Sequence, residues 1–259
     1  MNEMFCFQCQ QTAHNTGCEG KTGVCGKKAD TANYQDELIG ALIGLARAAE
    51  NGNPTEKTDE LVLKGLFTTI TNVNFNNETI KKLKTEIEKE KGRISSEHFE
   101  DYDMKNIWDA HEDVRSLKSL VLFEIKGMAA YAYHSLVLGK TDREVTDFFY
   151  KALRLIGEDA SPDALLELVM ETGKVNFKCM AMLDAANTDA YGDPVPTTVP
   201  LTIEKGPFIV VSGHDLHDMK LLLEQTKGKG INIYTHSEML PAHEYPKLKE
   251  YSHLKGNFG

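Results

Sequence analysis

The stretch GPFIVVSGHDLHDMKLLLEQTKGKGINIYTHSEML, residues 206–240, contains the pattern that decides the fold class of the C-terminal part of the chain. Its apolar run over 207–212 is typical of a strand that is buried on both faces. An amphipathic helix is predicted over 215–226, two glycines end it, and a second buried strand follows over 231–235. A strand, a helix and a strand in this order predict a βαβ unit, and therefore a parallel, doubly wound (Rossmann-like) sheet of the α/β class.

Two candidate metal ligands follow the two predicted strands. His214 comes directly after the first strand, and Glu238 follows the second. The carboxyl ends of neighbouring parallel strands meet at one edge of a sheet, where doubly wound sheets bind ligands. An imidazole and a carboxylate suit iron that carries bridging oxygen. From the residues alone, however, a helix-cap neighbour for His214 and an exposed loop acid for Glu238 are the simpler interpretations.

Three further histidines and one further cysteine could in principle bind metal, but each is more simply interpreted as a surface or core residue. His217, His236 and His243 lie close to the two candidates in sequence, and each alone is more simply a surface or packing residue than a proton donor. Cys179 lies between apolar residues in a predicted helix, which indicates a position in the core.

The region upstream of the βαβ unit is predicted to be a bundle of helices. Apolar residues recur there at spacings of three and four, most clearly over 111–138. Thr141 is a predicted N-cap, with Glu144 completing a capping box, for a helix that ends near residue 156. Long helices joined by short connections indicate a mainly α-helical bundle. Further helices are predicted over 34–50, 61–70, 80–87 and 162–186.

The chain is therefore expected to have three parts. A loop rich in cysteine and glycine occupies residues 1–30, and the helical bundle extends over 31–200. Three prolines close to residue 200 mark a linker, and residues 201–259 form the start of an α/β domain that is incomplete.

The N-terminal loop carries four of the five cysteines, in the pattern Cys6-x2-Cys9-x8-Cys18-x6-Cys25. Two residues between the first pair let the backbone turn once, and the longer gaps let the chain bring two more thiolates to the same metal group. Four thiolates suit either a four-iron or a two-iron cluster, and the glycines between them allow positive φ and close backbone approach. Structural zinc usually has two short cysteine pairs, and disulfide frameworks belong to short exported chains. The spacing therefore favours an iron–sulfur cluster.

The bulk properties exclude some classes of partner. The 259 residues carry a formal net charge of −10, and an acidic surface repels the phosphate backbone of nucleic acids. No apolar run reaches the roughly 18 residues that a membrane span needs. The N-terminus lacks the basic and apolar segments of a signal peptide. We therefore expect a cytoplasmic protein without nucleic-acid or membrane partners.

Three stretches together resemble the N-terminal portion of the hybrid-cluster (prismane, or hydroxylamine reductase) family. They are the cysteine loop with the segment after it, residues 4–42; IKGMAAYAYHSLVLG, residues 125–139; and residues 206–259, which contain SGHDL and YTHSEMLPAH. These motifs are specific because they occur together in the order found in the family, so the resemblance extends over the whole chain.

The resemblance implies two clusters. The first is a conventional cluster on the four N-terminal cysteines, and their compact spacing resembles that of members with [4Fe–4S] rather than [2Fe–2S]. The second is a hybrid [4Fe–2O–2S] cluster, where substrate is reduced, and His214 and Glu238 match its first two ligands. The activity that this implies is reduction of hydroxylamine to ammonia and water with electrons from a ferredoxin-like protein or a reductase, and nitric oxide reduction is a further possibility in the family. The residues matching the first cluster are Cys6, Cys9, Cys18 and Cys25.

The chain departs from the family pattern in one respect. The other cysteines and the second glutamate of the hybrid cluster lie beyond the family position that matches Gly259, and no cysteine follows Cys179 here. The resemblance then implies a fragment, a truncated reading frame or one half of a split reductase, which alone does not assemble the catalytic cluster. The alternative is a stand-alone iron–sulfur electron-transfer or redox-sensing module without catalysis of its own. A carbon monoxide dehydrogenase relative is less favoured, since the N-terminal cysteines of that family are arranged differently.

Overall fold

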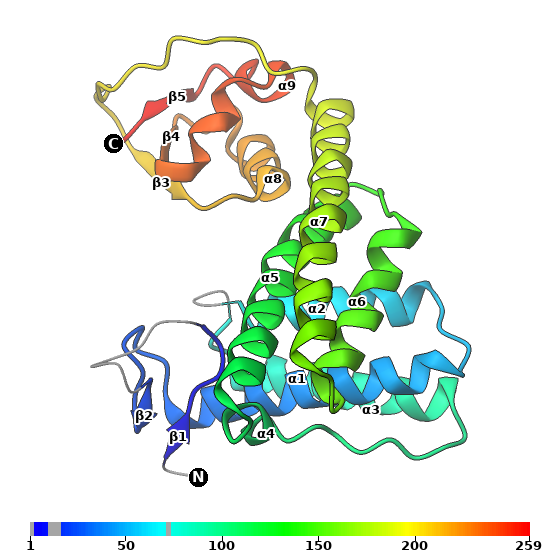
Figure 1. Ribbon diagram of the computed structural model, residues 1–259. Helices are drawn as coiled ribbons and strands as arrows, with labels where there is room; N and C mark the ends of the chain where they lie inside the picture. The colour runs from blue at the N-terminus through cyan, green and yellow to red at the C-terminus, as the bar shows by residue number, and fades with distance from the viewer. Residues whose placement is uncertain (1–2, 10–16, 71–73) are drawn as a thin grey trace. The chain divides into compact units, whose positions relative to one another are not determined.

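The computed structural model describes residues 3–9, 17–70 and 74–259. The chain divides into two compact units (Figure 1). The first unit comprises Met1–Tyr133 and Thr141–Met180, and the second comprises His134–Lys140 and Ala181–Gly259. Within the described residues, no helix combines the length and the apolar character that crossing a bilayer requires.

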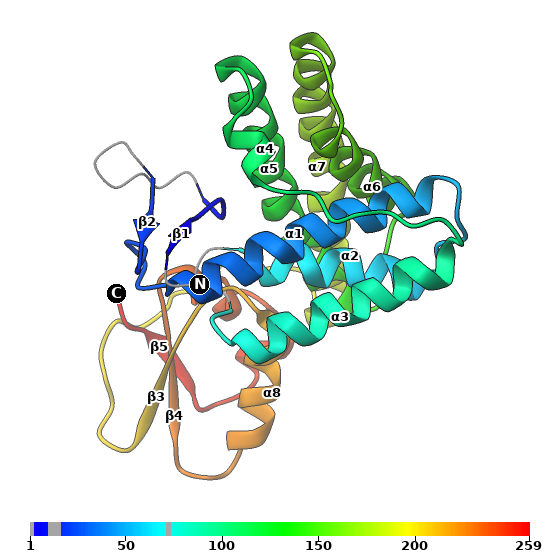
Figure 2. The same ribbon diagram turned by 90° about the horizontal axis from the view of Figure 1, so that it is seen from below.

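The first unit is mainly helical, and it is organised around one buried helix, α1. Residues 38–46 of α1 are buried on every side, which is the pattern of a helix in the middle of a bundle. Helix α1 packs beside α3 and α6, and Figure 2 shows α1 running alongside α3. The helices are α1 (Ala29–Glu50), α2 (Glu56–Thr68), α3 (Asn77–Ile94), α4 (Lys105–Trp108), α5 (Glu112–Val137), α6 (Arg143–Gly157) and α7 (Pro162–Tyr191), of which α5 and α7 continue into the second unit.

The close packing around α1 depends on glycine at one contact. A Cβ atom added to Gly40 would lie 2.3 Å from the carbonyl oxygen of Tyr102, a distance at which backbone has to move. The amide of Tyr102 in turn donates to the carbonyl of Gly40 at 3.1 Å. The segment before α4 therefore lies directly on the backbone of α1.

The start of helix α6 corrects one prediction. Its N-cap is Asp142, whose carboxylate accepts hydrogen bonds from the amides of Glu144 at 2.9 Å and Val145 at 3.2 Å, so the predicted N-cap Thr141 is wrong by one residue. Both residues have side chains that cap helices. The Asp142 carboxylate also forms an ion pair with Lys178 of α7 at 3.1 Å. The Thr141 hydroxyl carries no charge and could not form this ion pair.

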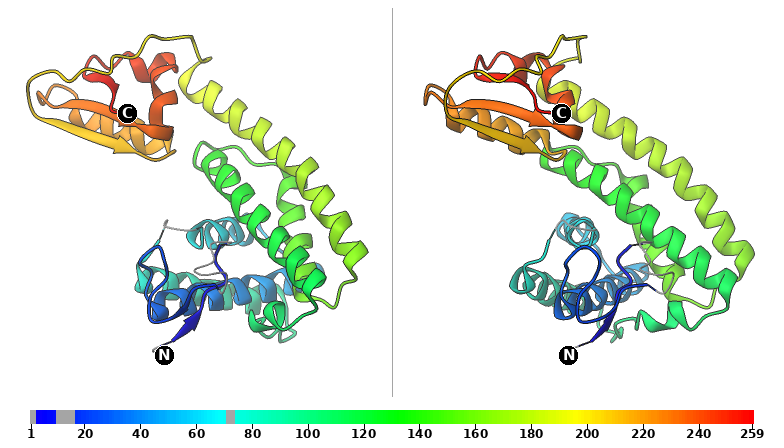
Figure 3. Two further views of the ribbon diagram at one scale, coloured as in Figure 1. Left: turned by 60° about the vertical axis from the view of Figure 1, so that its left-hand side comes forward. Right: turned by 90° about the vertical axis from the view of Figure 1, so that its left-hand side faces the viewer.

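The second unit contains a parallel sheet of three strands in the order β3-β4-β5, which confirms the predicted parallel pairing. Met219 and Leu223 of α8 pack with Ile233 of β4 in its core, and Figure 3 shows α8 lying along the sheet. The elements are β3 (Phe208–Ser212), α8 (Leu216–Thr226), β4 (Asn232–His236), the 3-10 helix η2 (Ser237–His243), α9 (Pro246–Lys249) and β5 (Leu254–Asn257).

Strand β3 differs from its prediction as a strand buried on both faces. Phe208, Ile209 and Val210 are all exposed, whereas Ile233 and Tyr234 of β4 are buried as predicted. In the described part of the chain β3 pairs with β4 alone, so it lies at an edge of the sheet. A continuous apolar run indicates a strand, but it does not indicate which elements cover its faces.

Candidate metal sites

The N-terminal loop brings two of the four predicted thiolate ligands together. Two short antiparallel strands, β1 (Met4–Phe5) and β2 (Glu19–Gly20), pair there. The amide of Cys6 donates to the carbonyl of Cys18 at 3.0 Å, which extends this pairing by one step. Both cysteines are partly buried against an apolar group made of Met4, Ala29 and Ala32.

The other two cysteines differ from each other in exposure. Cys9 is partly buried and Cys25 is exposed. Over the described ranges, no three side chains of Cys, His, Asp or Glu gather closely enough to hold a metal ion. Residues 10–16, between Cys9 and Cys18, lie outside the described residues. Because metal sites commonly complete their geometry when the metal binds, ligation by these four cysteines stays a prediction.

Glycines give the cysteine loop backbone angles that other residues rarely adopt. Gly20 and Gly26 have φ of +81° and +83°, the left-handed backbone that a side chain would strain. A Cβ atom at Gly23 would lie 3.7 Å from the sulfur of Cys18, an ordinary van der Waals separation, so Gly23 lies beside that thiol. The structure therefore confirms the predicted positive φ at Gly20 and Gly26, while close backbone approach to the sulfur atoms of a bound cluster stays a prediction.

A buried polar network lies directly behind the Cys6–Cys9 turn. Lys126 of α5 is 4% exposed, and its ammonium group donates to the carbonyl oxygen and the side-chain Oε1 of Gln8, both at 2.8 Å. Gln8 is 2% exposed, and its Nε2 donates to a carboxylate oxygen of Asp36 on α1. Removal from water lowers the pKa of Lys126 to about 7 and raises the pKa of Asp36 to about 7, because burial disfavours both charged forms.

The charges around this network suit an anionic group. Lys27 is buried as well, and it lies close enough to influence the pKa values of Cys6, Asp36 and Lys126. Burial raises the pKa of the Cys6 thiol to about 11, which favours the neutral thiol. Iron binding would deprotonate the thiol, and four thiolates on an iron–sulfur cluster leave a net negative charge. A negatively charged cluster would favour the charged forms of the two buried lysines, which outnumber the one aspartate, so the residues present fit such a cluster.

The sequence patterns did not single out this network. Lys126 lies four residues after Leu122 and three before Ala129, both buried, and therefore within the apolar stripe of α5. Asp36 lies in the same way between Ala32 and Ile39 of α1. A charged residue at a core position needs a partner. The presence of Lys126 and Asp36 within apolar stripes was therefore the sequence signal that could have identified the network.

The structure brings His214 and Glu238 together at the edge of the sheet. Strands β3 and β4 pair in parallel, with Ser212 opposite His236, so each candidate lies two residues after the last paired residue of its strand. His214 Nε2 lies 2.9 Å from Glu238 Oε2, and the two side chains are 65% and 69% exposed. The backbone of Ser237 has φ of +52°, a sparsely populated value for a residue with a side chain. The proximity expected from strand order is present, while iron ligation by the pair stays a prediction.

The neighbouring histidines have distinct surroundings. His134 Nδ1 lies 3.6 Å from a carboxylate oxygen of Asp215, which caps α8, and burial lowers the pKa of His134. His243 is buried, and its Nε2 lies 2.9 Å from the Thr235 hydroxyl, so it is a packing residue. Cys179 is buried with its thiol 3.6 Å from the carbonyl of Met128, which confirms the predicted core position.

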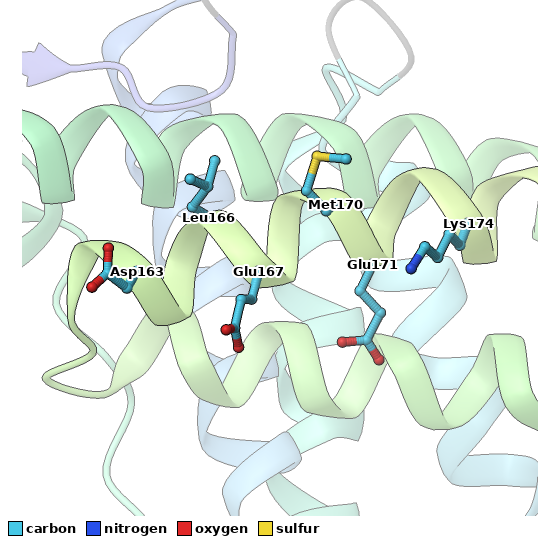
Figure 4. Close-up of a pocket in the computed structure, with 6 residues that line it drawn as sticks. All are labelled: Asp163, Leu166, Glu167, Met170, Glu171 and Lys174. Carbon is cyan, nitrogen blue, oxygen red and sulfur yellow. The ribbon is translucent and has the colours of Figure 1, made fainter.

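A shallow hollow on α7 contains none of the predicted site residues. Its volume is about 680 Å³. Figure 4 shows that its lining side chains all project from the one helix, and they do not converge on a common point. Ligand sites have polar groups that converge in a concave cavity, so no site is placed here. The lining residues are Asp163, Leu166, Glu167, Met170, Glu171 and Lys174.

Comparison with known proteins gives the class of this chain. Residues 4–259 match the Prismane/CO dehydrogenase family, and the chain belongs to that family. A curated relative from Solidesulfovibrio magneticus, named hydroxylamine reductase, is 45% identical over 99% of this chain and 53% of its own length. A second, of the same name, from Bacteroides thetaiotaomicron is 43% identical over 99% of this chain and 51% of its own length.

The chain therefore spans about half the length of the curated relatives it matches. Among solved structures, carbon monoxide dehydrogenase IV from Carboxydothermus hydrogenoformans matches 95% of this chain and 42% of its own, with 16% identity and a TM-score of 0.32.

Proposed function

We propose that this chain forms the N-terminal part of a hydroxylamine reductase, and that the four N-terminal cysteines hold a [4Fe–4S] cluster. The observation that carries this proposal is the cysteine loop backed by two buried lysines, in a chain of the prismane family. When bound, the cluster supplies one-electron transfer. The thiolates of the loop would hold it, and the ammonium groups of Lys27 and Lys126 would offset its negative charge.

The second half of the proposal concerns His214 and Glu238. We propose that they give one imidazole nitrogen and one carboxylate to a hybrid [4Fe–2O–2S] cluster. The overall reaction takes up two electrons and two protons, breaks the N–O bond of hydroxylamine, and releases ammonia and water. A ferredoxin-like protein or a reductase would supply the electrons. Two ligands do not complete the coordination of four irons, so the activity is proposed for the whole protein and not for these 259 residues alone.

Metal and sulfide analysis of anaerobically purified protein tests the first half. After reconstitution with iron and sulfide, about four irons and about four sulfides per chain are expected. Cys18→Ala should lower both values strongly, whereas the matched variant Cys179→Ala should keep them, since Cys179 lies in the helical core. Zinc without sulfide, or full loading of the Cys18 variant, would contradict the proposed cluster.

The same preparation tests the second half. Hydroxylamine should not oxidise a reduced dye through this chain alone, even when it carries its N-terminal cluster. Turnover of hydroxylamine by the isolated chain would show that ligands other than those proposed complete its catalytic site.

A further inference from the structure

We infer that Lys126 is a positioning residue for the N-terminal cluster: by donating two hydrogen bonds to Gln8, it fixes the turn between Cys6 and Cys9 and sets the cluster's retention and reduction potential. This inference rests on the proposed cluster and goes beyond it, because Lys126 is neither a cysteine nor part of the loop. It belongs to α5, 118 residues away from Gln8 in the chain.

The hydrogen bonds determine the orientation of one peptide unit. The carbonyl that accepts from Lys126 belongs to Gln8, so it forms the peptide bond to Cys9. In a planar trans peptide the carbonyl oxygen and the following N–H point in opposite directions. With the oxygen held toward Lys126, the N–H of Cys9 is held toward the other side of the turn. Amide donors beside cluster sulfurs are among the groups that set a cluster's potential.

The side chain of Gln8 is held from two directions at once. Its oxygen accepts from Lys126, and its nitrogen donates to Asp36 of α1. The turn is thereby tied to two helices of the bundle instead of depending on the loop alone. Lys126 itself has little freedom, since Leu122, Ile125 and Ala129 around it on α5 are buried.

The positive charge of Lys126 should affect the reduction potential of the cluster as well as its hydrogen bonds do. Reducing a cluster by one electron adds one negative charge, and a nearby buried ammonium group stabilises that charge. Loss of the ammonium group should therefore make the reduced cluster less favourable and the potential more negative.

Lys118 provides a matched comparison on the same helix. It is 5% exposed, lies roughly two turns before Lys126, and donates to the carbonyl of Glu158 at 2.6 Å. It is thus a buried lysine with a backbone acceptor, but its acceptor lies outside the cysteine loop. If buried lysines in α5 only satisfy carbonyls, removing either one should have the same effect on a cluster.

The experiment compares Lys126→Met with Lys118→Met in the whole chain, reconstituted with iron and sulfide without oxygen. Circular dichroism first establishes that each variant is folded. For Lys126→Met we expect iron loss to a chelator at least about tenfold faster than in the parent. We also expect an equilibrium constant for reduction at least about tenfold lower, which is a potential about 59 mV more negative for one electron. Lys118→Met should keep the parent's values for both.

A second variant keeps the inference testable if Lys126→Met does not fold. Lys126→Gln keeps a donor and lacks the charge, so its potential should be more negative than the parent's. Two results would overturn this inference and leave the proposed cluster standing. One is a cluster-loaded variant at position 126 that keeps the parent's potential and iron-loss rate. The other is a Lys118→Met variant whose potential and iron-loss rate change as much as those of Lys126→Met. A parent chain that takes up no iron and sulfide would overturn the proposed cluster, and this inference with it.

Discussion

His243 is a buried side chain that is hydrogen-bonded to polar groups of the second unit. His243 Nε2 and Asn257 Oδ1 each lie 2.9 Å from the Thr235 hydroxyl, which donates to the Asn257 oxygen, and the His243 ring is also hydrogen-bonded to the backbone of Gly256. Burial lowers the pKa of His243, because the charged imidazolium loses its hydration inside the unit. The neutral ring is therefore part of the core of the second unit.

This predicts an acid-sensitive second unit. Since the pKa of His243 is lower in the folded than in the unfolded chain, the unfolded chain binds more protons once the pH falls below about 6.5. The free energy of unfolding should then fall between pH 7 and pH 5, and His243→Gln should reduce that slope. Hydrogen exchange of the β4 amides at both pH values measures it. His111→Gln, at an exposed position, is the control and should keep the slope. Equal slopes in the parent and the His243 variant would contradict the prediction.

The position of a single residue could be predicted from the sequence where that residue type, with such neighbours, usually has one role. Cys179, with apolar neighbours, was predicted to be in the core and is there. Prediction failed for Lys126 and Asp36, because a search for apolar periodicity passes over the charged residues within the stripe. The ligand roles of the four cysteines are predictions that need metal to test.

At the scale of elements, length and periodicity decided what could be predicted. The long helices follow from repeats of three and four, and β4 follows from a compact apolar run. The two-residue strands β1 and β2 and the four-residue β5 were missed, since so few residues carry no period. The burial of β3 was wrong for another reason: a sequence window contains no information about the elements that cover a strand.

The start of α6 gives a test at this scale. Asp142→Ala should lower the free energy of unfolding by about 1 kcal/mol, because two amides at the helix start lose their acceptor. The loss of the contact with Lys178 adds little, since that lysine is itself well exposed. Thr141→Ala should change stability by less than about 0.5 kcal/mol. Urea unfolding of both variants decides between the two N-caps. A larger loss of unfolding free energy in Thr141→Ala than in Asp142→Ala would show that Thr141 is the N-cap, as the sequence predicted.

At the scale of the whole molecule, strand order was the most informative part of the sequence. It placed His214 and Glu238 at the same edge of a parallel sheet, and the structure has them 2.9 Å apart. What the sequence analysis did not anticipate is that α5 and α7 each contribute to both compact units. A continuous helical pattern carries no mark of such a division.

Cluster binding should therefore affect the two units unequally. A group that binds only the folded loop stabilises that part of the protein, by an amount that grows with the logarithm of the ratio of its concentration to its dissociation constant. Loading with iron and sulfide should slow amide exchange in residues 17–28 and around Lys126, and leave β4 and β5 as they were. The empty protein under the same anoxic conditions is the reference. Equal slowing in both units would show that the effect is not local to the loop.

The parallel ladder between β3 and β4 makes the His214–Glu238 pair tolerant of one kind of mutation and intolerant of another. Five rungs, from Phe208 opposite Asn232 to Ser212 opposite His236, set where the two side chains emerge. Residues inserted into the glycine turn at 227–230 lengthen a surface connection and leave those rungs unchanged. A slip of one rung would displace one partner by about 3.3 Å and turn it to the opposite face. Insertions or deletions in the turn are thus harmless to the His214–Glu238 pair. A single-residue insertion or deletion inside either strand shifts the register and separates the two side chains.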